Sequence, residues 1–505
     1  MTSTKLKLTQ RYIAIFCAAL ALYVISCAPG TLWQDSGLIQ YRIWHNDIEG
    51  FFGLAVSHPL FYLVAIAAKY VPLGAFARRA NLVSSIAGAV AVANMFLLVR
   101  LWLGRDFPAV IAAITLAVSH TFWRHASIIE TYTLWAALFL AELIVLLQYV
   151  RTNRVRYLYW LGLLNGLAIA VHMLASIAFV CYAVFIVFLL ARKKIRAKDL
   201  AIILLLWMVG ALPYEFLIIK SMIQTSDIAG TLASAAFGTR WRGAVLNVSM
   251  STAIVKENLG YILFNFPTPN FLLALAGGFA LIKMSPSRSF RNVLLALIAL
   301  FFIFAFRYPV PDRYAFFIPF YVTVSILIGL GTHLVLDRTN YKALAFLLLL
   351  FSLLPVAVCA AAPKIAKRMH LGISSRNDVP HREDDIYFLQ PWKTGYRGAE
   401  RFADEALGSV ADNALIYADV TTVAPLLLAQ QIEGKRPDVT IISGTVNSED
   451  APPFNAETID RSLETRPIYV VSRKPGYCPA FVLENYDLVQ SGILWRVVGK
   501  NKQKL

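Results

Sequence analysis

Residues 11–37 have the sequence RYIAIFCAALALYVISCAPGTLWQDSG, an apolar run followed by one carboxylate, Asp35. A run of about 20 apolar residues is long enough to cross the hydrocarbon core of a membrane as a helix. This run is not followed by a cleavage pattern of small residues, so we expect residues 11–29 to stay as a signal anchor. A carboxylate beside a spanning helix is costly unless it is solvated, paired or functional. Asp35 therefore either caps a loop or belongs to a site, and the rest of the chain favours a site.

Apolar runs continue through residues 11–362 and determine the fold class. Hydrophobic residues make up 58% of the chain and its mean hydropathy is +0.61, well above the balance of soluble domains. Short basic loops separate the runs, which is typical of an α-helical polytopic membrane protein. We predict about eleven transmembrane helices. They lie near residues 11–29, 80–102, 107–122, 131–150, 157–172, 173–190, 199–220, 260–282, 292–307, 314–335 and 341–362.

The distribution of charge predicts the topology. The net charge is +17, but residues 1–362 hold 29 Lys and Arg against 12 Asp and Glu, whereas residues 363–505 hold 18 of each. Basic residues gathered in alternate loops report orientation in the membrane, so they do not indicate a nucleic acid partner. We predict that the N-terminus lies inside and that the C-terminal region lies on the outer face.

The apolar segment 58–72 is not counted as a span. It is about 15 residues long, short of the usual ~20, and it contains Lys69. That charge would cost ~2.5–3.5 kcal/mol at the bilayer centre. We expect an interfacial helix on the outer surface. Counting the segment as a span would move the basic cluster 192–198 to the outer face.

The predicted outer loops gather carboxylates, imidazoles and arginines from four separate turns. The first outer loop, residues 30–79, is the longest. Aromatic and basic residues at helix ends are also common as a membrane belt or as snorkelling side chains. Convergence of all these groups at one face favours a binding site. The residues concerned are Asp35, His58, Arg79, Arg124, Glu130, His172 and Arg313.

The C-terminal region predicts a soluble α/β domain. We divide the chain into a membrane domain (1–362), a linker (363–398) and this outer-facing domain (399–505). Strands at 414–418 and 439–443 flank an amphipathic helix that ends at Gly434, which indicates a βαβ unit. A third strand is expected at 467–472 and a closing pair of strands within 481–498.

Several short motifs occur in an order that resembles a known family. They are Trp33-x-Asp35-Ser36-Gly37, His58-Pro59-x-x-Tyr62, Arg79-x-Asn81-Leu82-x-Ser84, Phe122-Trp123 with Glu130-x-Tyr132, Gly166-Leu167 with His172, and Arg436-Pro437-Asp438-Val439. The chain resembles the protein O-mannosyltransferase-like family of polytopic GT-C glycosyltransferases. The resemblance covers most of the chain and rests on the shared order of the motifs.

The resemblance implies a reaction and assigns residues to it. GT-C enzymes take a sugar from a polyprenyl-phosphate carrier at the outer face and have a catalytic acid in the first outer loop, where Asp35 matches. A carboxylate there can act as general base on the acceptor hydroxyl. The departing lipid phosphate needs cations, and arginine offers a bidentate fork. Arg79, Arg124, His172 and Arg313 are the candidate cations, and His58 and Glu130 are further substrate-binding candidates. His58 could instead cap the short helix that Pro59 opens.

No metal or cofactor is predicted. The sequence has no Asp-x-Asp pair, no His pair with ligand spacing and no Gly-rich phosphate loop, so a soluble nucleotide donor is disfavoured. Glu142 and Glu215 lie within predicted spans. They would serve either as a proton relay in a transporter or as paired groups inside the helix bundle.

The sequence therefore predicts a membrane glycosyltransferase that moves a sugar, with mannose as a candidate, from a polyprenyl-phosphate carrier to a hydroxyl on protein Ser or Thr, a lipid or a glycan. We expect a multi-pass protein of the bacterial inner membrane with a periplasmic C-terminal domain, or of the endoplasmic reticulum in a eukaryote. One alternative is a transporter or flippase of lipid-linked sugars, although the inverted repeat common in transporters is not evident. A non-catalytic scaffold is a third hypothesis.

Overall fold

A computed structural model describes residues 3–72, 74–238, 241–338, 342–373 and 378–501. The chain forms two compact units, each built from separate stretches of sequence. The first unit comprises Met1–Cys27, Asp47–Ala67 and Leu82–Ala361, and the second comprises Ala28–Asn46, Ala68–Asn81 and Ala362–Leu505. The two units are described separately below.

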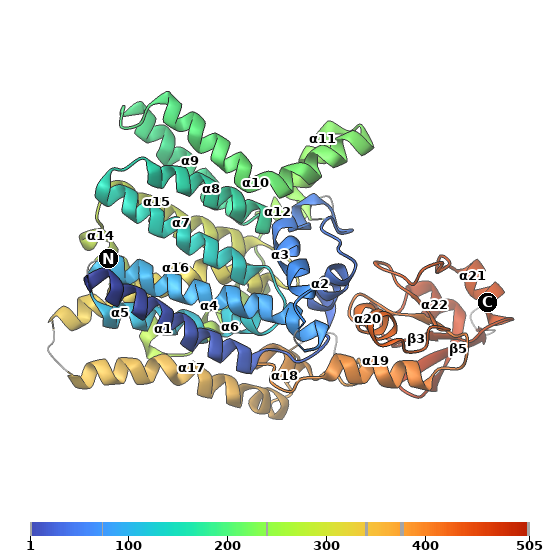
Figure 1. The fold of residues 1–505 in the computed structure, drawn as a ribbon. Helices are drawn as coiled ribbons and strands as arrows, with labels where there is room; N and C mark the ends of the chain where they lie inside the picture. The colour runs from blue at the N-terminus through green and yellow to red at the C-terminus, as the bar shows by residue number, and fades with distance from the viewer. Residues whose placement is uncertain (1–2, 73, 239–240, 339–341, 374–377, 502–505) are drawn as a thin grey trace. The chain divides into compact units, whose positions relative to one another are not determined.

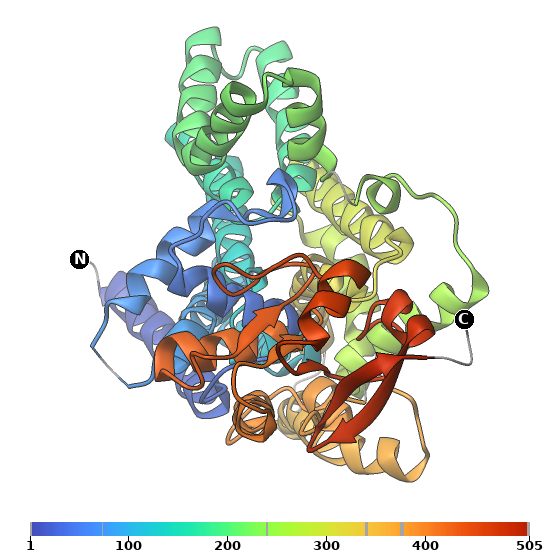
Figure 2. The same cartoon turned by 90° about the vertical axis from the view of Figure 1, so that its right-hand side faces the viewer.

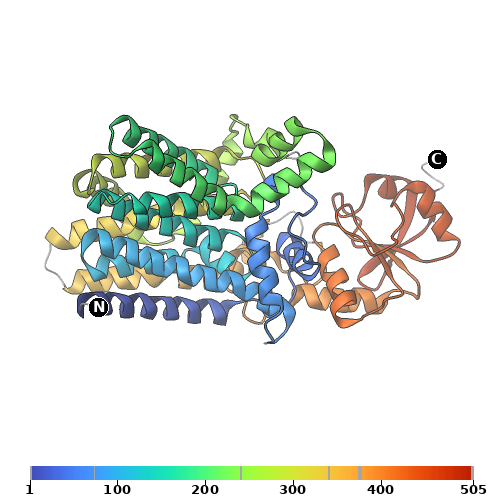
Figure 3. The same cartoon turned by 45° about the horizontal axis from the view of Figure 1, so that its top comes forward.

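Long apolar helices dominate the first unit. Within the described residues, seven helices are long and apolar enough to cross a membrane. They are α1 (Ser3–Ser26), α4 (Phe76–Leu103), α7 (Tyr132–Thr152), α10 (Ala197–Thr225), α15 (Arg288–Arg307), α16 (Ile318–Arg338) and α17 (Lys342–Arg368). Figures 1 and 3 show α1 running along α4, where the Tyr12 hydroxyl donates to Asn94 Oδ1 (3.0 Å).

The two spans predicted at 107–122 and 260–282 are each formed by a bent pair of helices. α5 (Asp106–Val118) and α6 (His120–Ser127) meet at 63°, and α13 (Thr252–Asn265) meets the segment of η2 (Pro269–Leu272) and α14 (Leu273–Met284) at 110°. Ser119 has an extended conformation at the first break. Pro267 and Pro269 stop the helix at the second. The two breaks are joined, because the Thr121 backbone N–H donates to Asn265 Oδ1 (2.9 Å).

Two further predicted spans form shorter helices. α8 (Arg156–Val171) and α9 (Ala175–Ala191) have 16 and 17 residues. The Glu142 carboxylate of α7 accepts a hydrogen bond from Asn165 of α8 (3.2 Å), so this acid is paired inside the bundle. By length and composition the described residues give seven spanning helices, or up to nine if each bent pair is one span. The count of eleven therefore stays a prediction.

Close packing of α14 against α16 depends on a glycine. A Cβ atom added at Gly277 would lie 1.8 Å from the Leu327 carbonyl oxygen, whereas one added at Gly278 would meet nothing within 4 Å. Small residues let helix backbones approach closely in membranes. Gly277 therefore sets the distance between these two helices.

Several short helices complete the first unit. α3 (Pro59–Lys69) has 11 residues, a length of roughly 16 Å, which is about half of the hydrocarbon core. This length agrees with the prediction that residues 58–72 do not cross the membrane. The others are η1 (Leu54–Val56), α11 (Ile228–Phe237), α12 (Arg242–Val245) and η3 (Arg313–Phe317).

A five-stranded sheet forms the centre of the second unit (Figure 2). Its order is β2-β1-β3-β5-β4, with β1 (Leu415–Tyr417) parallel to both β2 (Thr440–Ile442) and β3 (Ile468–Val470). β5 (Leu494–Lys500) runs antiparallel to β3 and to β4 (Tyr486–Ser491). α20 (Val423–Glu433) connects β1 to β2 and ends at Gly434, which has φ +68°. The predicted strands, the helix between the first two and the closing pair are confirmed.

The remaining helices of the second unit include part of the segment predicted as a linker. They are α2 (Gln34–Trp44), α18 (Asp384–Leu389), α19 (Gly398–Ser409), α21 (Ala456–Leu463) and α22 (Ala480–Asn485). Tyr387 and Tyr396 are buried, so residues 384–398 pack as part of this unit. Residues 374–377 of the predicted linker lie outside the described residues.

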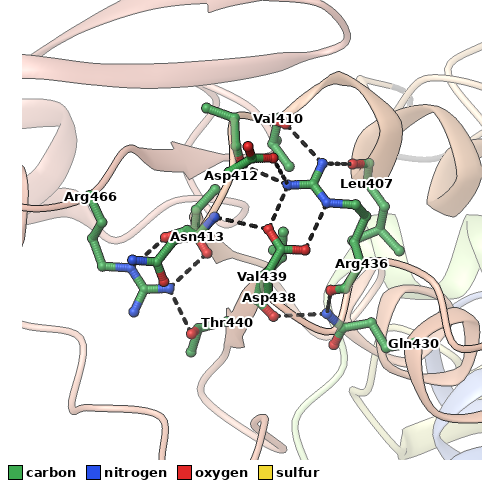
Figure 4. A network of polar contacts seen from close by, with 12 residues as sticks. Leu407, Val410, Asp412, Asn413, Gln430, Arg436, Asp438, Val439, Thr440 and Arg466 are labelled. Atoms are coloured by element: carbon green, nitrogen blue, oxygen red, sulfur yellow. Dashed lines mark hydrogen bonds and ion pairs between the residues drawn. The ribbon is translucent and has the colours of Figure 1, made fainter.

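Arg436, from one of the sequence motifs, joins three segments of this unit (Figure 4). Its guanidinium donates to the carbonyl oxygens of Leu407 (2.9 Å) and Val410 (3.0 Å) at the end of α19, and it pairs with both oxygens of Asp438 (2.8 Å each) before β2. Hydrogen bonding to Arg436 holds the pKa of the Asp438 carboxyl well below its ordinary value, and the Asn413 backbone N–H lowers it further. Arg436 therefore has a structural role.

Candidate functional site

Five aromatic rings from separate segments form a continuous row in the first unit. The ring centroids are 4.7 Å apart for His58 and His172, 5.0 Å for His172 and Tyr132, 5.1 Å for Tyr132 and His125, and 5.9 Å for His125 and Tyr314. These are ordinary distances for ring contacts. We call His58, His172, Tyr132, His125 and Tyr314 the ring row.

Hydrogen bonds set the role of Nδ1 in the two imidazoles at one end of the row. His58 Nδ1 lies 2.9 Å from the Val171 carbonyl oxygen, so this nitrogen donates. The Leu174 backbone N–H donates to His172 Nδ1 (3.1 Å), so that nitrogen carries no proton and the ring is neutral. His172 was predicted as a cation. In this arrangement it instead offers an N–H donor at Nε2.

Two buried arginines lie at the other end of the row. Arg124, in the last turn of α6, donates to the Tyr314 hydroxyl (2.8 Å), and its guanidinium lies 5.4 Å from the centre of the Tyr314 ring. Arg313, at the start of η3, forms an ion pair with Glu257 and donates to Asn258 Oδ1 (2.9 Å). The break at Ser119 separates α6 from the straight run of α5 and so sets where Arg124 and its neighbour His125 are placed.

Glu130 is held beside the row by its backbone. The Glu130 N–H donates to Ser84 Oγ (2.8 Å), and the Ser84 hydroxyl donates to the Glu130 carbonyl (2.9 Å). The carboxylates of Glu130 and Asp312 both interact electrostatically with Tyr132. Ser84 and Glu130 belong to two of the sequence motifs, and this reciprocal pair of hydrogen bonds joins the two motifs in space.

Asp35 and Arg79 belong to the second unit. Asp35 is exposed and lies in the first turn of α2, where the helix dipole favours a carboxylate. The Arg79 guanidinium, in the first turn of α4, donates to the carbonyl oxygens of Gly74 (2.6 Å) and Lys69 (3.1 Å). Arg79 thus links the start of α4 to the end of α3 and to the loop between these two helices.

Contacts within the first unit link five of the predicted site residues. His58 and His172 belong to the ring row, Arg124 and Glu130 adjoin it, and Arg313 reaches it through Tyr261, whose ring contacts Tyr314 (6.1 Å). Glu257 and Asn258 were not predicted, because the predicted span began at residue 260, later than α13 begins. Tyr261 lay inside that predicted span and was not singled out from its apolar neighbours. The charged pair Lys256-Glu257 ahead of that apolar run was the available signal.

The chemistry of this neighbourhood suits a polar, anionic ligand. Guanidinium groups, an imidazole N–H and tyrosine hydroxyls offer donors for phosphate and sugar oxygens, while carboxylates can accept from sugar hydroxyls. Within the described residues, no group of three or more His, Cys, Asp or Glu side chains is close enough to hold a metal ion.

This chain is similar to known proteins both in sequence, over one domain, and in fold. Residues 53–196 match the family model of the protein O-mannosyl-transferase TMEM260 N-terminal domain. The structure is similar to that of ArnT from Cupriavidus metallidurans bound to undecaprenyl phosphate, with a TM-score of 0.62 and 13% identity over 97% of this chain and 98% of that chain. It is also similar to the oligosaccharyltransferase AglB from Archaeoglobus fulgidus in complex with an inhibitory peptide and a dolichol-phosphate. That match has a TM-score of 0.50 and 13% identity over 87% of this chain and 65% of that chain.

These matches confirm the fold class predicted from the sequence, and the match at residues 53–196 agrees with the predicted reaction class. The structural neighbours share the GT-C fold, and the matched domain contains His58, Arg124, Glu130 and His172. Multiple apolar helices of spanning length agree with that fold. The chain is a multi-pass membrane protein with a GT-C-like fold, and its residues 53–196 match the N-terminal domain of the protein O-mannosyl-transferase TMEM260.

Proposed function

We propose that this protein transfers a sugar, with mannose as the first candidate, from a polyprenyl-phosphate carrier to a hydroxyl acceptor at the outer face of the membrane. The observation that carries the proposal is the ring row with Arg124 at its end, of which every member except Tyr314 lies within the residues that match the protein O-mannosyl-transferase TMEM260 N-terminal domain. The lipid phosphates bound to ArnT and AglB support a lipid-linked donor. Protein Ser or Thr, a lipid and a glycan are the candidate acceptors.

Asp35 is the proposed general base. The acceptor hydroxyl oxygen attacks the anomeric carbon and forms the new glycosidic bond, while its proton passes to the Asp35 carboxylate. The bond between the anomeric carbon and the phosphate oxygen breaks, and polyprenyl phosphate leaves as the anion. Asp35 is exposed and lies in the first predicted outer loop, on the side of the membrane where the proposal places the acceptor.

Arg124 is the leading proposed contact for the lipid phosphate, with Arg79 and Arg313 as the others. Arg124 is buried and donates directly to the Tyr314 hydroxyl of the ring row, Arg313 reaches the row through Tyr261, and Arg79 donates to two backbone carbonyl oxygens. A guanidinium has five N–H donors, so each can still serve a phosphate. His58, His172 and Glu130 are proposed to contact sugar hydroxyls.

The proposed orientation follows the positive-inside rule, with the α/β domain outside the cytoplasm. In a bacterium this location is the periplasmic side of the inner membrane, and in a eukaryote it is the lumen of the endoplasmic reticulum. A hydroxyl acceptor on a surface or secreted molecule is available on that side.

The decisive experiment uses the purified full-length protein in lipid nanodiscs. Polyprenyl-phosphate [14C]mannose is offered with Ser/Thr peptides, lipids or glycans, and GDP-[14C]mannose serves as the comparison donor. We expect label in an acceptor only with the lipid donor. Transfer from GDP-mannose without any lipid carrier would overturn the proposal. Mass spectrometry of surface glycoconjugates with and without the gene then identifies the acceptor.

The two broken helix pairs favour one alternative, a transporter of lipid-linked sugars, because such proteins use broken helices near the midplane. Reconstitution in sealed vesicles separates the two functions. A flippase would carry the intact lipid-linked sugar across the bilayer, whereas the transferase would release polyprenyl phosphate without moving the sugar across it.

A further inference from the structure

Trp33, two residues before Asp35, is anchored in the second unit by its indole ring. Trp33 is completely buried, and its Nε1–H donates to the Tyr396 hydroxyl (2.9 Å). The ring also packs against Phe402 of α19, with centroids 5.5 Å apart. Burial of the phenol raises the pKa of Tyr396, so it stays protonated. These partners lie more than 360 residues later in the sequence than Trp33.

Gln34 is held on both its backbone and its side chain. Its φ is +53°, a left-handed conformation that is uncommon for a residue with a side chain. The Gln34 N–H donates to the Thr421 carbonyl (3.3 Å), and its side-chain oxygen accepts from Arg382 Nη2 (3.0 Å). Arg382 is itself fixed by a buried ion pair with Asp384 (2.6 Å).

The residues after Asp35 are equally constrained. A Cβ atom at Gly37 would lie 2.3 Å from the Leu32 carbonyl oxygen and 3.2 Å from Ala424 of α20. Gln40 is completely buried, accepts from the Leu32 N–H (3.0 Å) and donates to Asn81 Oδ1 (3.0 Å). The backbone on each side of Asp35 is therefore fixed, while the carboxylate itself is exposed.

The groups that hold Gln34 lie at the carboxyl ends of parallel strands. Thr421 follows β1, and Ser472, which follows β3, donates to Asp378 in the segment that leads to Arg382. In the sheet, β2 lies on one side of β1 and β3 lies on the other. The strand order therefore reverses between β1 and β3. Open α/β sheets bind ligands at such a switch point. Here the switch point binds the segment that carries Asp35.

We propose that the C-terminal α/β domain positions the catalytic base. Tyr396 and Arg382 bind Trp33 and Gln34, and these contacts hold the backbone that carries Asp35 in one position. This inference rests on the proposed role of Asp35 as general base. Tyr396, Arg382, Trp33 and Gln34 are positioning residues, since they act through Asp35. Loosening this attachment lowers kcat and leaves the KM for the lipid donor unchanged, because a displaced base slows chemistry without removing donor contacts.

Kinetics of two matched tyrosine variants in the full-length protein test the proposal. Tyr396→Phe removes the hydroxyl that receives the Trp33 hydrogen bond. Tyr486→Phe, the control, removes the hydroxyl of another buried tyrosine, on β4, that donates to Asp460 (2.8 Å). With polyprenyl-phosphate [14C]mannose as donor, we expect Tyr396→Phe and Gln34→Ala to lower kcat by about 10- to 100-fold at constant KM. Tyr486→Phe keeps the wild-type kcat at a similar melting temperature.

A double variant separates positioning from general stability. In the Asp35→Asn background, adding Tyr396→Phe is expected to cause no further loss, because the residue it positions is already gone. The same extra loss in both backgrounds, or a wild-type kcat in Tyr396→Phe and Gln34→Ala, would overturn the proposal. Wild-type turnover by Asp35→Asn would instead overturn the proposed function of Asp35 itself.

Hydrogen exchange gives a readout that needs no substrate. Peptides that cover residues 32–40 are expected to exchange faster in Tyr396→Phe than in the wild type, and at the wild-type rate in Tyr486→Phe. Unchanged exchange of these peptides in Tyr396→Phe would show that the contact does not hold the segment and would overturn the positioning role.

Discussion

At the scale of single residues, Asp35 is exposed, whereas Trp33 before it and Ser36 after it are buried. Replacing Asp35 with Asn keeps size and removes the basic oxygen, so we expect glycosyl transfer to fall by about 10²–10⁴. Expression and membrane insertion should be unchanged. Asp487→Asn, at an exposed position on β4, is the matched control and should keep full turnover. Turnover by Asp35→Asn equal to the wild type would exclude Asp35 as the base.

Arg124 is the residue whose loss should affect the donor most. Arg124→Gln keeps a hydrogen-bond donor but removes the charge, and a charged hydrogen bond contributes about 1.5–3 kcal/mol. We expect the KM for polyprenyl-phosphate mannose to rise by roughly 10- to 150-fold. Saturation kinetics at fixed acceptor concentration measure this change. The KM for the acceptor should stay constant, and an unchanged donor KM would remove Arg124 from the donor site.

At the scale of secondary-structure elements, the α14–α16 contact depends on which of two adjacent glycines faces the partner helix. Gly277→Ala places a Cβ atom against the Leu327 carbonyl, and overpacking of this kind costs about 1–3 kcal/mol. Gly278→Ala, one residue away with nothing within 4 Å, should be neutral or slightly stabilising because alanine favours helix. Thermal unfolding in detergent compares the two variants. Equal melting temperatures would contradict the close approach.

The Arg436–Asp438 pair joins the end of α19 to the start of β2, and its contribution depends on pH. The pKa of Asp438 is lowered in the folded state relative to the ordinary value of about 3.9. The carboxylate therefore contributes stability above about pH 4, and the contribution is lost as pH falls through the lowered pKa. Asp438→Asn should lower the melting temperature of the full-length protein at pH 7, and the difference from the wild type should narrow below about pH 4. A pH-independent difference would argue against an electrostatic origin.

At the scale of the whole molecule, the basic loops predict one orientation in the membrane. A reporter that is active only outside the cytoplasm should be active when fused after Leu505 and inactive when fused near Lys194. The reverse pattern would mean that an odd number of spans precedes the Arg192–Lys198 cluster, where we predict an even number. The short length of α3 makes residues 58–72 an unsuitable extra span.

Different parts of the molecule were predictable to different degrees, for physical reasons. The strands of the α/β domain and the helix end at Gly434 follow from local alternation and turn chemistry, which the sequence carries directly. The break at Ser119 was missed because apolar residues continue across it without a proline. The partners of Trp33 were missed because nothing near Trp33 in the sequence indicates Tyr396 or Phe402. The neutral state of His172 depends on one backbone N–H, which only the fold supplies.

The assembly of the second unit from early and late sequence also sets the order of events during synthesis. Trp33 leaves the ribosome 363 residues before Tyr396, a delay of roughly 20–70 s at about 5–20 residues per second. Throughout that interval the indole and the strained Gln34 backbone have no native partner from the C-terminal region. The Asp35 segment can reach its final form only after the α/β domain has been translated and has folded. A prematurely terminated chain would therefore insert into the membrane with its proposed catalytic segment unassembled, so synthesis of the last domain acts as a checkpoint on activity.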